Sequence, residues 1–313
     1  MSRERPLYAI VGPTAVGKTR TAYELARIIN GEIISVDSRQ VYRYLDVGTD
    51  KISPLERKIV LHHLIDVADP DEIFTAADFV KQSMDASRRI ESRRKVPILA
   101  GGTPMYFKSL EGGMLSESLP HDESIRRELD RDAELRGAHA LHDELNAIDP
   151  ASAERIHPND KARIVRALEI FKLSGCSATE LYARHKKIGG ERGIIYFGIT
   201  APREILFDRI ERRVREQFHS GYPEEVRWLL DNGYSRDLPA LRGFGYRELV
   251  DYIDGKITFD DAMAGDVQST KAFSRRQMTW FRQFSPILWY DFSEITLERA
   301  VHDMAEKIHR SGG

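Results

Sequence analysis

Short apolar runs alternate with amphipathic stretches in the first third of the chain. Residues 7–11 form a five-residue apolar run, and residues 18–29 then repeat apolar positions at helical spacing. Further runs at 32–36 and 96–100 predict strands, and the segment from 75 to 93 between them predicts a helix. Because strands that are apolar throughout and separated by helices are typical of parallel sheets, we expect a sheet with helices on both faces.

The middle of the chain has a different pattern. From about Gly113 to Arg192 it is charged and helical in its periodicity, without a convincing strand. Strand-like runs return at 194–200 and 286–290, with a predicted helix from Pro202. We therefore predict an α/β fold with two parts. A P-loop NTPase-like core of residues 1–113 and 194–313 is interrupted by an inserted all-helical domain of residues 114–193.

Composition narrows the functional classes. The chain has 313 residues, 41% of them hydrophobic, so it can bury a substantial core. No apolar run approaches the roughly 20 residues of a membrane span, and no secretory signal precedes the first strand. The single cysteine, Cys176, excludes a multi-cysteine zinc site and suits a reducing compartment. We expect a cytoplasmic enzyme without a membrane partner.

A net charge of −2 means that any nucleic-acid binding depends on local basic patches. One such patch is a stretch near the C-terminus, residues 267–290, which has four basic residues, several aromatic residues and no acid. Basic and aromatic side chains together suit contact with phosphates and bases, although the aromatic residues are better explained by inward packing.

The strongest motif lies between the first predicted strand and helix. Its eight residues are Gly12, Pro13, Thr14, Ala15, Val16, Gly17, Lys18 and Thr19. Glycines let backbone N–H groups surround phosphate oxygens, the lysine reaches the outer phosphates, and the final hydroxyl can ligate Mg²⁺. With a strand before it and a helix after it, this segment predicts a phosphate-binding loop rather than a simple glycine-rich turn.

The acids around this motif do not match those of an ATPase. In ATPases a second apolar strand usually ends in a carboxylate that holds magnesium, whereas the run at 96–100 is followed by Gly101, Gly102 and Thr103. Asp37 is the acid at a comparable position, after the run at 32–36. It could serve magnesium, act as a base, or cap a local turn. The adjacent His62 and His63 would point to opposite faces of a strand, so a packing role is favoured over metal binding.

Taken together, these motifs resemble the tRNA dimethylallyltransferases, also called tRNA isopentenyltransferases, over essentially the whole chain. The matching stretches are residues 12–19, 37–42, 48–51, 62–66, 101–103, 159–169, 243–247 and 275–281. The resemblance implies transfer of a dimethylallyl group from dimethylallyl diphosphate to N6 of the adenosine next to the anticodon on its 3′ side. It also implies Mg²⁺ as cofactor and the tRNA anticodon stem-loop as partner; a monomer suffices for this reaction.

The resemblance also implies roles for individual residues. Asp37 would be the base, and Thr103 would lie beside the reacting centre. Lys18 and Arg213 would stabilise the diphosphate together with residues 12–19, with Arg212 as an adjacent competitor, and Thr19 would hold the metal. The tRNA contacts would be Asp37, Ser38, Arg39, Gln40, Thr103, Ala162, Arg163, Ile164, Val165, Arg166, Lys271, Arg275 and Arg276.

Three positions depart from the family pattern: Ile52 replaces a usual proline, Pro104 a usual glycine, and Ala162 a longer polar residue. Since proline lacks an N–H, residue 104 cannot donate a backbone hydrogen bond. Three alternatives remain open on the residues alone. They are a P-loop kinase, a prenyltransferase acting on free adenine nucleotides, and a tRNA-binding protein without catalytic activity.

Overall fold

A six-stranded sheet forms the centre of the larger of two units in the computed structural model. The structure describes residues 5–112, 114–115, 121–184, 187–188, 192–284 and 286–311. The chain divides into one unit of Met1–Gly113 with Gly189–Gly313, the core unit, and a second of Met114–Ile188, the helical unit.

The strands of the core unit lie in the order β3-β2-β4-β1-β7-β8, and all neighbouring pairs are parallel. Their bounds are β1 Leu7–Val11, β2 Gly31–Val36, β3 His62–His63, β4 Val96–Gly101, β7 Ile194–Thr200 and β8 Ile287–Asp291. The five apolar runs in the sequence therefore form strands as predicted, because parallel strands covered on both faces need continuous apolar side chains. The two-residue β3 was not predicted as a strand.

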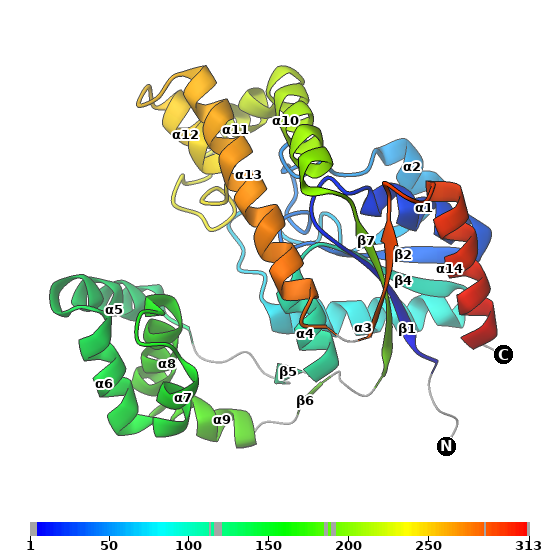
Figure 1. Cartoon of the computed structure of the whole chain (residues 1–313). Helices are drawn as coiled ribbons and strands as arrows, with labels where there is room; N and C mark the ends of the chain where they lie inside the picture. The colour runs from blue at the N-terminus through cyan, green and yellow to red at the C-terminus, as the bar shows by residue number, and fades with distance from the viewer. Residues whose placement is uncertain are drawn as a thin grey trace. The chain divides into compact units, whose positions relative to one another are not determined.

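Helices cover this sheet and extend beyond it (Figure 1). They are α1 Lys18–Ile28, α2 Pro54–Ile59, α3 Ala76–Ser92, α4 Pro104–Gly112, α10 Arg203–His219, α11 Tyr222–Asp231, α12 Tyr246–Ile253, α13 Phe259–Phe281 and α14 Leu297–Ser311. The start of α3 is set locally, since Thr75 and Asp78 form a reciprocal capping box. Pro104 occupies the first position of α4, where an N–H has no partner within the helix, so its presence is compatible with the fold.

Two apolar clusters hold the core unit together. One lies where the central strands meet α1 and α14, and includes Ile10, Leu25 and Val301. The other joins the chain after β2 to α10, α11 and α12, around Val41 and Tyr222. The second cluster fixes the segment after β2 against α10 and α11, and so places polar residues of that segment at one edge of the sheet.

The helical unit comprises α5 Glu123–Arg136, α6 Ala138–Ile148, α7 Pro150–Arg155, α8 Lys161–Ser174 and α9 Ala178–Arg184. Its core is a separate cluster that includes Leu129, Leu141 and Leu168. The unit also contains a short antiparallel pair, β5 Met114–Leu115 and β6 Lys187–Ile188. This pair corrects the prediction of an all-helical insert, because two-residue strands are too short to leave a periodic pattern.

The adjacent histidines make separate contacts, as expected from their alternation in β3. His62 Nδ1 lies 2.8 Å from the carbonyl oxygen of Val60, and His63 Nε2 lies 2.8 Å from Glu32 Oε2. In the part of the chain that the structure describes, no three His, Cys, Asp or Glu residues are grouped to hold a metal ion. Over the same residues, none of the helices has the length and apolar character needed to cross a membrane.

Candidate active site

The glycine-rich loop between β1 and α1 has the conformation that its sequence predicts. Gly12 has a φ of +149°, and a Cβ at this position would lie 2.3 Å from the carbonyl oxygen of Ile199. Only glycine fits so close to the neighbouring strand β7. The loop ends where α1 begins, at Lys18. Anions bind favourably at such a helix N-terminus, because its backbone N–H groups are unpaired and the helix dipole is positive there.

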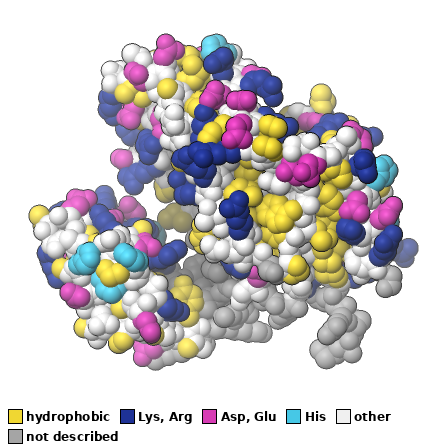
Figure 2. Space-filling model, viewed as in Figure 1, with side chains coloured by type: hydrophobic (Ala, Val, Ile, Leu, Met, Phe, Trp, Pro, Cys, Tyr) yellow, Lys and Arg dark blue, Asp and Glu magenta, His cyan; other side chains and the backbone are white. Residues whose placement is uncertain are grey.

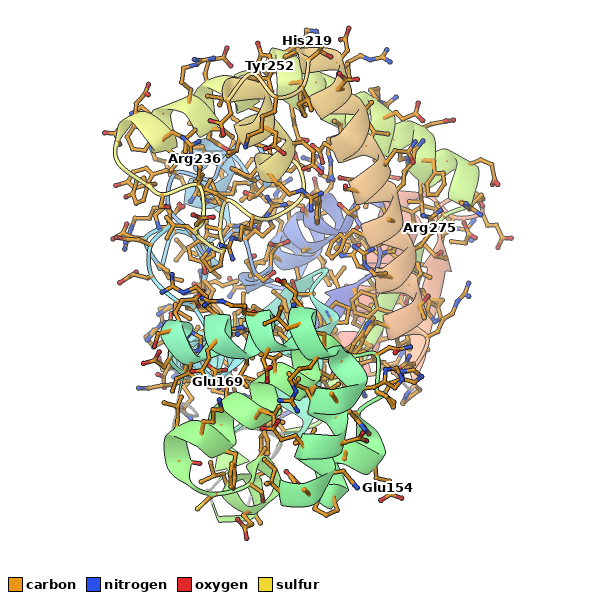
Figure 3. All side chains as sticks on the ribbon, turned by 90° about the vertical axis from the view of Figure 1, so that its left-hand side faces the viewer. Glu154, Glu169, His219, Arg236, Tyr252 and Arg275 are labelled. Atoms are coloured by element: carbon orange, nitrogen blue, oxygen red, sulfur yellow. The ribbon has the colours of Figure 1, made fainter. Side chains whose placement is uncertain are left out.

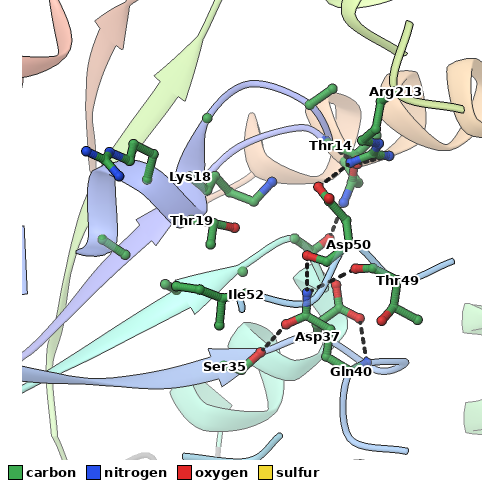
Figure 4. A pocket seen from close by; sticks show the side chains of 18 of the residues that line it. Thr14, Lys18, Thr19, Ser35, Asp37, Gln40, Thr49, Asp50, Ile52 and Arg213 are labelled. Carbon is green, nitrogen blue, oxygen red and sulfur yellow. Dashed lines mark hydrogen bonds and ion pairs between the residues drawn. The ribbon is translucent and has the colours of Figure 1, made fainter. Parts of the chain in front are cut away.

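A cavity of about 380 Å³ opens beside this loop at the carboxyl end of the strands. Parallel α/β sheets bind their ligands at this edge. The lining combines the phosphate loop, the ends of β2 and β4, and one face of α10 (Figure 4). Residues in this lining include Thr14, Ala15, Gly17, Lys18, Thr19, Asp37, Gln40, Thr49, Asp50, Gly102, Arg209, Arg212, Arg213, Phe273 and Gln277.

Lys18 is partly buried in the cavity wall. Its Nζ donates a hydrogen bond to the carbonyl oxygen of Pro13 at 2.7 Å. Burial lowers the pKa of Lys18 from 10.5 to about 8, opposed by the nearby carboxylates of Asp37 and Asp50 and reinforced by Arg213. An anion bound in the loop would favour the protonated ammonium.

Arg213 reaches the phosphate loop from α10. Its Nη2 donates to Thr14 Oγ1 at 2.9 Å, and its Nη1 lies 3.4 Å from Asp50 Oδ2. The Arg213 side chain is 24% exposed, whereas Arg212 faces outward on the cavity rim. Of the two adjacent arginines, Arg213 is therefore the one whose guanidinium contacts the loop.

Asp37 follows β2 and lines the cavity. Its Oδ1 accepts hydrogen bonds from the backbone N–H groups of Arg39 at 2.9 Å and Gln40 at 3.2 Å. The carboxylate therefore caps a turn, as one of the alternatives for this residue predicted. This cap is compatible with a role as a base, because both hydrogen bonds use Oδ1 and leave Oδ2 for a further contact. The two bonds also hold the carboxylate at the cavity wall.

Thr103 and Gln40 are held beside Asp37 by hydrogen bonds between strand ends. Thr103 Oγ1 accepts from the backbone N–H of Ser38 at 3.2 Å, which ties the end of β4 to the end of β2. The amide of Gln40 accepts from Ser35 Oγ at 3.0 Å and donates to the carbonyl oxygen of Thr49 at 3.1 Å. The structure thus brings Asp37, Ser38, Gln40 and Thr103 together, as the sequence led us to expect.

Arg39 lies differently from its neighbours. Its guanidinium is positioned over the rings of Phe244 and Tyr246, 4.9 and 4.7 Å from their centroids, and donates to the Phe244 carbonyl oxygen at 3.0 Å. The side chain is therefore directed into the core unit. The tRNA contact expected of Arg39 stays a prediction, and cation–π packing holds its guanidinium against these two rings.

The predicted tRNA contacts on α8 fall into two groups. Ile164 and Val165 are 0% and 1% exposed and belong to the apolar core of the helical unit, so their side chains are not available to RNA. Helical periodicity turns these two positions inward, so their burial counts against direct side-chain contacts with tRNA at Ile164 and Val165. Ala162 and Arg163 are exposed, and Arg166 is partly exposed and pairs with Glu169 at 2.7 Å. Glu169 is labelled in Figure 3.

The predicted contacts on α13 are basic, and two of the three lie near the aromatic ring of Phe207. Lys271 pairs with Glu211 and lies 5.1 Å from the Phe207 ring centroid, and Arg275 lies 5.9 Å from it. Arg275 and Arg276 are exposed, and Figure 2 shows Lys and Arg side chains gathered over α13. Together with Trp280 they line a shallow groove of about 310 Å³.

Two aromatic residues at and after the end of α13 pack inward, as expected, whereas Trp280 is partly exposed. Phe281 and Phe284 are 0% and 4% exposed.

Two residues of the cavity had no role assigned from the sequence. Asp50 faces Arg213 across the pocket, and Gln277 hydrogen-bonds to the phosphate loop. Both lie within stretches that match the family, at 48–51 and 275–281. The family match of these stretches was the feature of the sequence that could have identified both residues as part of the site.

The glycine-rich loop at the carboxyl edge of a parallel sheet, with Lys18 and Arg213 directed at it, defines a P-loop phosphate-binding α/β protein. Comparisons with known proteins identify the family. The family model described as IPP transferase matches residues 40–284. The tRNA dimethylallyltransferase of Halalkalibacterium halodurans is 39% identical over 95% of both chains. That of Geobacter sulfurreducens is 44% identical over 91% of this chain and 92% of its own.

A crystal structure of a tRNA isopentenylpyrophosphate transferase from Bacillus halodurans also matches. It has a TM-score of 0.72 and 38% identity, and the match covers 98% of this chain and 97% of that one. The chain therefore belongs to the IPP transferase family of tRNA dimethylallyltransferases. The predicted α/β P-loop fold and the assignment as a tRNA dimethylallyltransferase-type enzyme are confirmed.

Proposed function

We propose that this enzyme transfers the dimethylallyl group of dimethylallyl diphosphate to N6 of the adenosine on the 3′ side of the anticodon, and releases diphosphate. The observation that supports this most is that one cavity contains both a phosphate-binding loop and the carboxylate of Asp37. A leaving diphosphate and a proton acceptor can therefore act on the same reacting centre.

Asp37 is the general base in this proposal. The N6 lone pair of adenine is delocalised into the ring, so N6 becomes an effective nucleophile only as its proton is removed. As the bond between N6 and C1 of the dimethylallyl group forms, the bond between C1 and the diphosphate oxygen breaks. The bonding electrons leave with diphosphate, and the N6 proton passes to the Asp37 carboxylate.

Lys18 and Arg213 stabilise the charge that develops on the diphosphate. Lys18 is hydrogen-bonded to the loop at Pro13 and Arg213 contacts Thr14, so both cations lie at the loop before the reaction begins. Preorganised charges of this kind stabilise a developing anion without reorganisation during the reaction. A phosphate-binding loop is thereby used to break a carbon–oxygen bond, with no phosphoryl transfer.

Magnesium fits the residues of this site. Of the two hydroxyls in the phosphate loop, Thr14 accepts from Arg213 and Thr19 also lines the cavity, and the described residues form no carboxylate cage. This suits Mg²⁺, which usually keeps several waters and binds largely through substrate phosphates. Thr19 would hold the ion, and the ion would neutralise diphosphate charge. In this proposal Thr103 orients the acceptor adenine beside Asp37; its hydrogen bond with the N–H of Ser38, which ties the ends of β4 and β2 together, supports this role.

The partner in this proposal is the anticodon stem-loop of tRNA. The exposed cations of α13, Arg275 and Arg276, can contact its backbone, and Ala162, Arg163 and Arg166 of α8 offer a second surface. Lys271 contributes to the charge of α13 while it is paired with Glu211. We further propose that the enzyme acts as a cytoplasmic monomer, since one chain supplies every group that the chemistry requires.

The test uses purified enzyme, Mg²⁺ and labelled dimethylallyl diphosphate, with an anticodon stem-loop and AMP as competing acceptors. We expect label only in the stem-loop, and none when the target adenosine is replaced by guanosine. Label in AMP alone would show a prenyltransferase of free nucleotides, and label in neither acceptor would refute the proposed donor.

A further inference from the structure

The side chain of Gln277 connects α13 to two parts of the active site. Gln277 is 3% exposed. Its Oε1 accepts a hydrogen bond from the backbone N–H of Thr14 at 2.8 Å, and its Nε2 donates to the carbonyl oxygen of Gly102 at 2.5 Å. One amide therefore joins the phosphate loop to the turn that precedes Thr103.

The neighbouring backbone leaves no space around this amide. A Cβ added at Gly102 would lie 2.4 Å from Gln277 Nε2 and 3.5 Å from Lys18 Nζ. A side chain at 102 would therefore displace the Gln277 amide from its hydrogen bonds. The contact brings Gln277 to the same side of the loop as the lysine that binds diphosphate.

The chemistry of the contact requires an amide. The backbone of Thr14 presents a donor and that of Gly102 an acceptor, and the glutamine amide supplies both complements from one side chain. A glutamate could accept from Thr14 but not donate to Gly102, and methionine could do neither. Because the contact is buried, a lost bond would leave a backbone group without its partner, so the loop and the turn are expected to move with α13.

The opposite side of α13 faces solvent at the two preceding residues, Arg275 and Arg276. We infer that Gln277 is a positioning residue that couples RNA docking on α13 to diphosphate binding in the phosphate loop, so that each ligand tightens binding of the other. This inference rests on the proposed function, because it takes α13 as an RNA-docking helix. Such coupling is reciprocal by thermodynamic necessity.

The experiment measures binding of inorganic diphosphate by calorimetry, in buffer with Mg²⁺, to the free enzyme and to enzyme saturated with anticodon stem-loop RNA. In the wild type we expect RNA to tighten diphosphate binding at least about fivefold, within the usual range of coupling between sites. In Gln277→Met this ratio should fall to about one. Gln277→Glu, which keeps the acceptor, should give an intermediate ratio.

Matched controls are Gln268→Met and Gln268→Glu, because Gln268 is exposed on the same helix. These variants should keep the wild-type ratio. Gly102→Ala disturbs the same contact from the other side and should also lower the ratio, so the test does not depend on the folding of one variant. A wild-type ratio of one would overturn the inference. So would a folded Gln277→Met enzyme that keeps the wild-type ratio.

A separate prenyl-transfer assay of the wild type distinguishes the two claims. An enzyme that transfers the group normally but shows no Gln277-dependent coupling contradicts only this inference. An enzyme that cannot modify the stem-loop contradicts the proposed function itself.

Discussion

The cavity of the core unit and the α8 surface of the helical unit use charge in opposite ways. In the cavity, the partly buried side chains of Lys18, Asp37 and Arg213 come together from different parts of the chain. On α8, the cations pair with nearby acids, Arg163 with Asp160 at 3.1 Å and Arg166 with Glu169 at 2.7 Å. Charges held at fixed positions, as in the cavity, suit catalysis. Surface ion pairs, as on α8, can exchange partners and suit contact with a large ligand.

The largest expected effect is at Asp37. Asp37→Asn keeps a capping oxygen for the turn but removes the base, so we expect kcat to fall by about 10³-fold, as for loss of general base catalysis. Single-turnover assays with a saturating stem-loop would measure the loss. Calorimetry with inorganic diphosphate serves as the control and should give wild-type affinity. Normal turnover in this variant would refute the base role.

The adjacent arginines of α10 sharpen the comparison within the cavity. Arg213→Gln should lower kcat/KM for dimethylallyl diphosphate by about 100-fold, because a preorganised charge on the leaving group is lost. Arg212→Gln is the matched control. Since Arg212 is exposed on the rim of the cavity, this substitution should lower kcat/KM only a few-fold. Salt screens exposed charges, so the decrease should be smaller at high salt. Equal losses in both variants would contradict the assignment of Arg213.

The pH dependence of diphosphate binding tests Lys18. Only the protonated ammonium attracts diphosphate, and burial lowers the pKa of Lys18 to about 8 in the free enzyme. Affinity should therefore be constant below this pKa and fall above it, by up to about tenfold for each further pH unit. Calorimetry between neutral pH and about pH 9.5 covers this range. Lys18→Met should bind weakly and lose this dependence; an identical pH profile in the variant would exclude Lys18 as its source.

The smallest effects on activity are expected on α8. Arg163→Ala should weaken stem-loop binding a few-fold and reduce the salt dependence by about one phosphate contact, measured by filter binding at several salt concentrations. Ile164→Ala should instead destabilise the helical unit by about 2–5 kcal/mol, because it opens a cavity in the core, measured by thermal unfolding. A loss of RNA affinity in Ile164→Ala without loss of stability would restore this residue as a direct contact.

The parts of the fold that local rules determine were predictable from the sequence. The phosphate loop follows from glycine positions and a strand-to-helix junction, and α3 from its capping residues, so both were predictable. The contacts of Gln277 with Thr14 and of Arg213 with Asp50 join residues 263 and 163 positions apart, and no local periodicity encodes them. Burial of Arg39 between two distant aromatic rings was unpredictable for the same reason.

The central claim is that this enzyme prenylates the adenosine next to the anticodon. Mass spectrometry of tRNA nucleosides, from cells with the gene, cells without it and cells complemented with Asp37→Asn, tests it most directly. We predict the N6-dimethylallyl adenosine, or a product made from it, only where the wild-type gene is present. Undiminished prenylated adenosine in the cells without the gene would contradict the account.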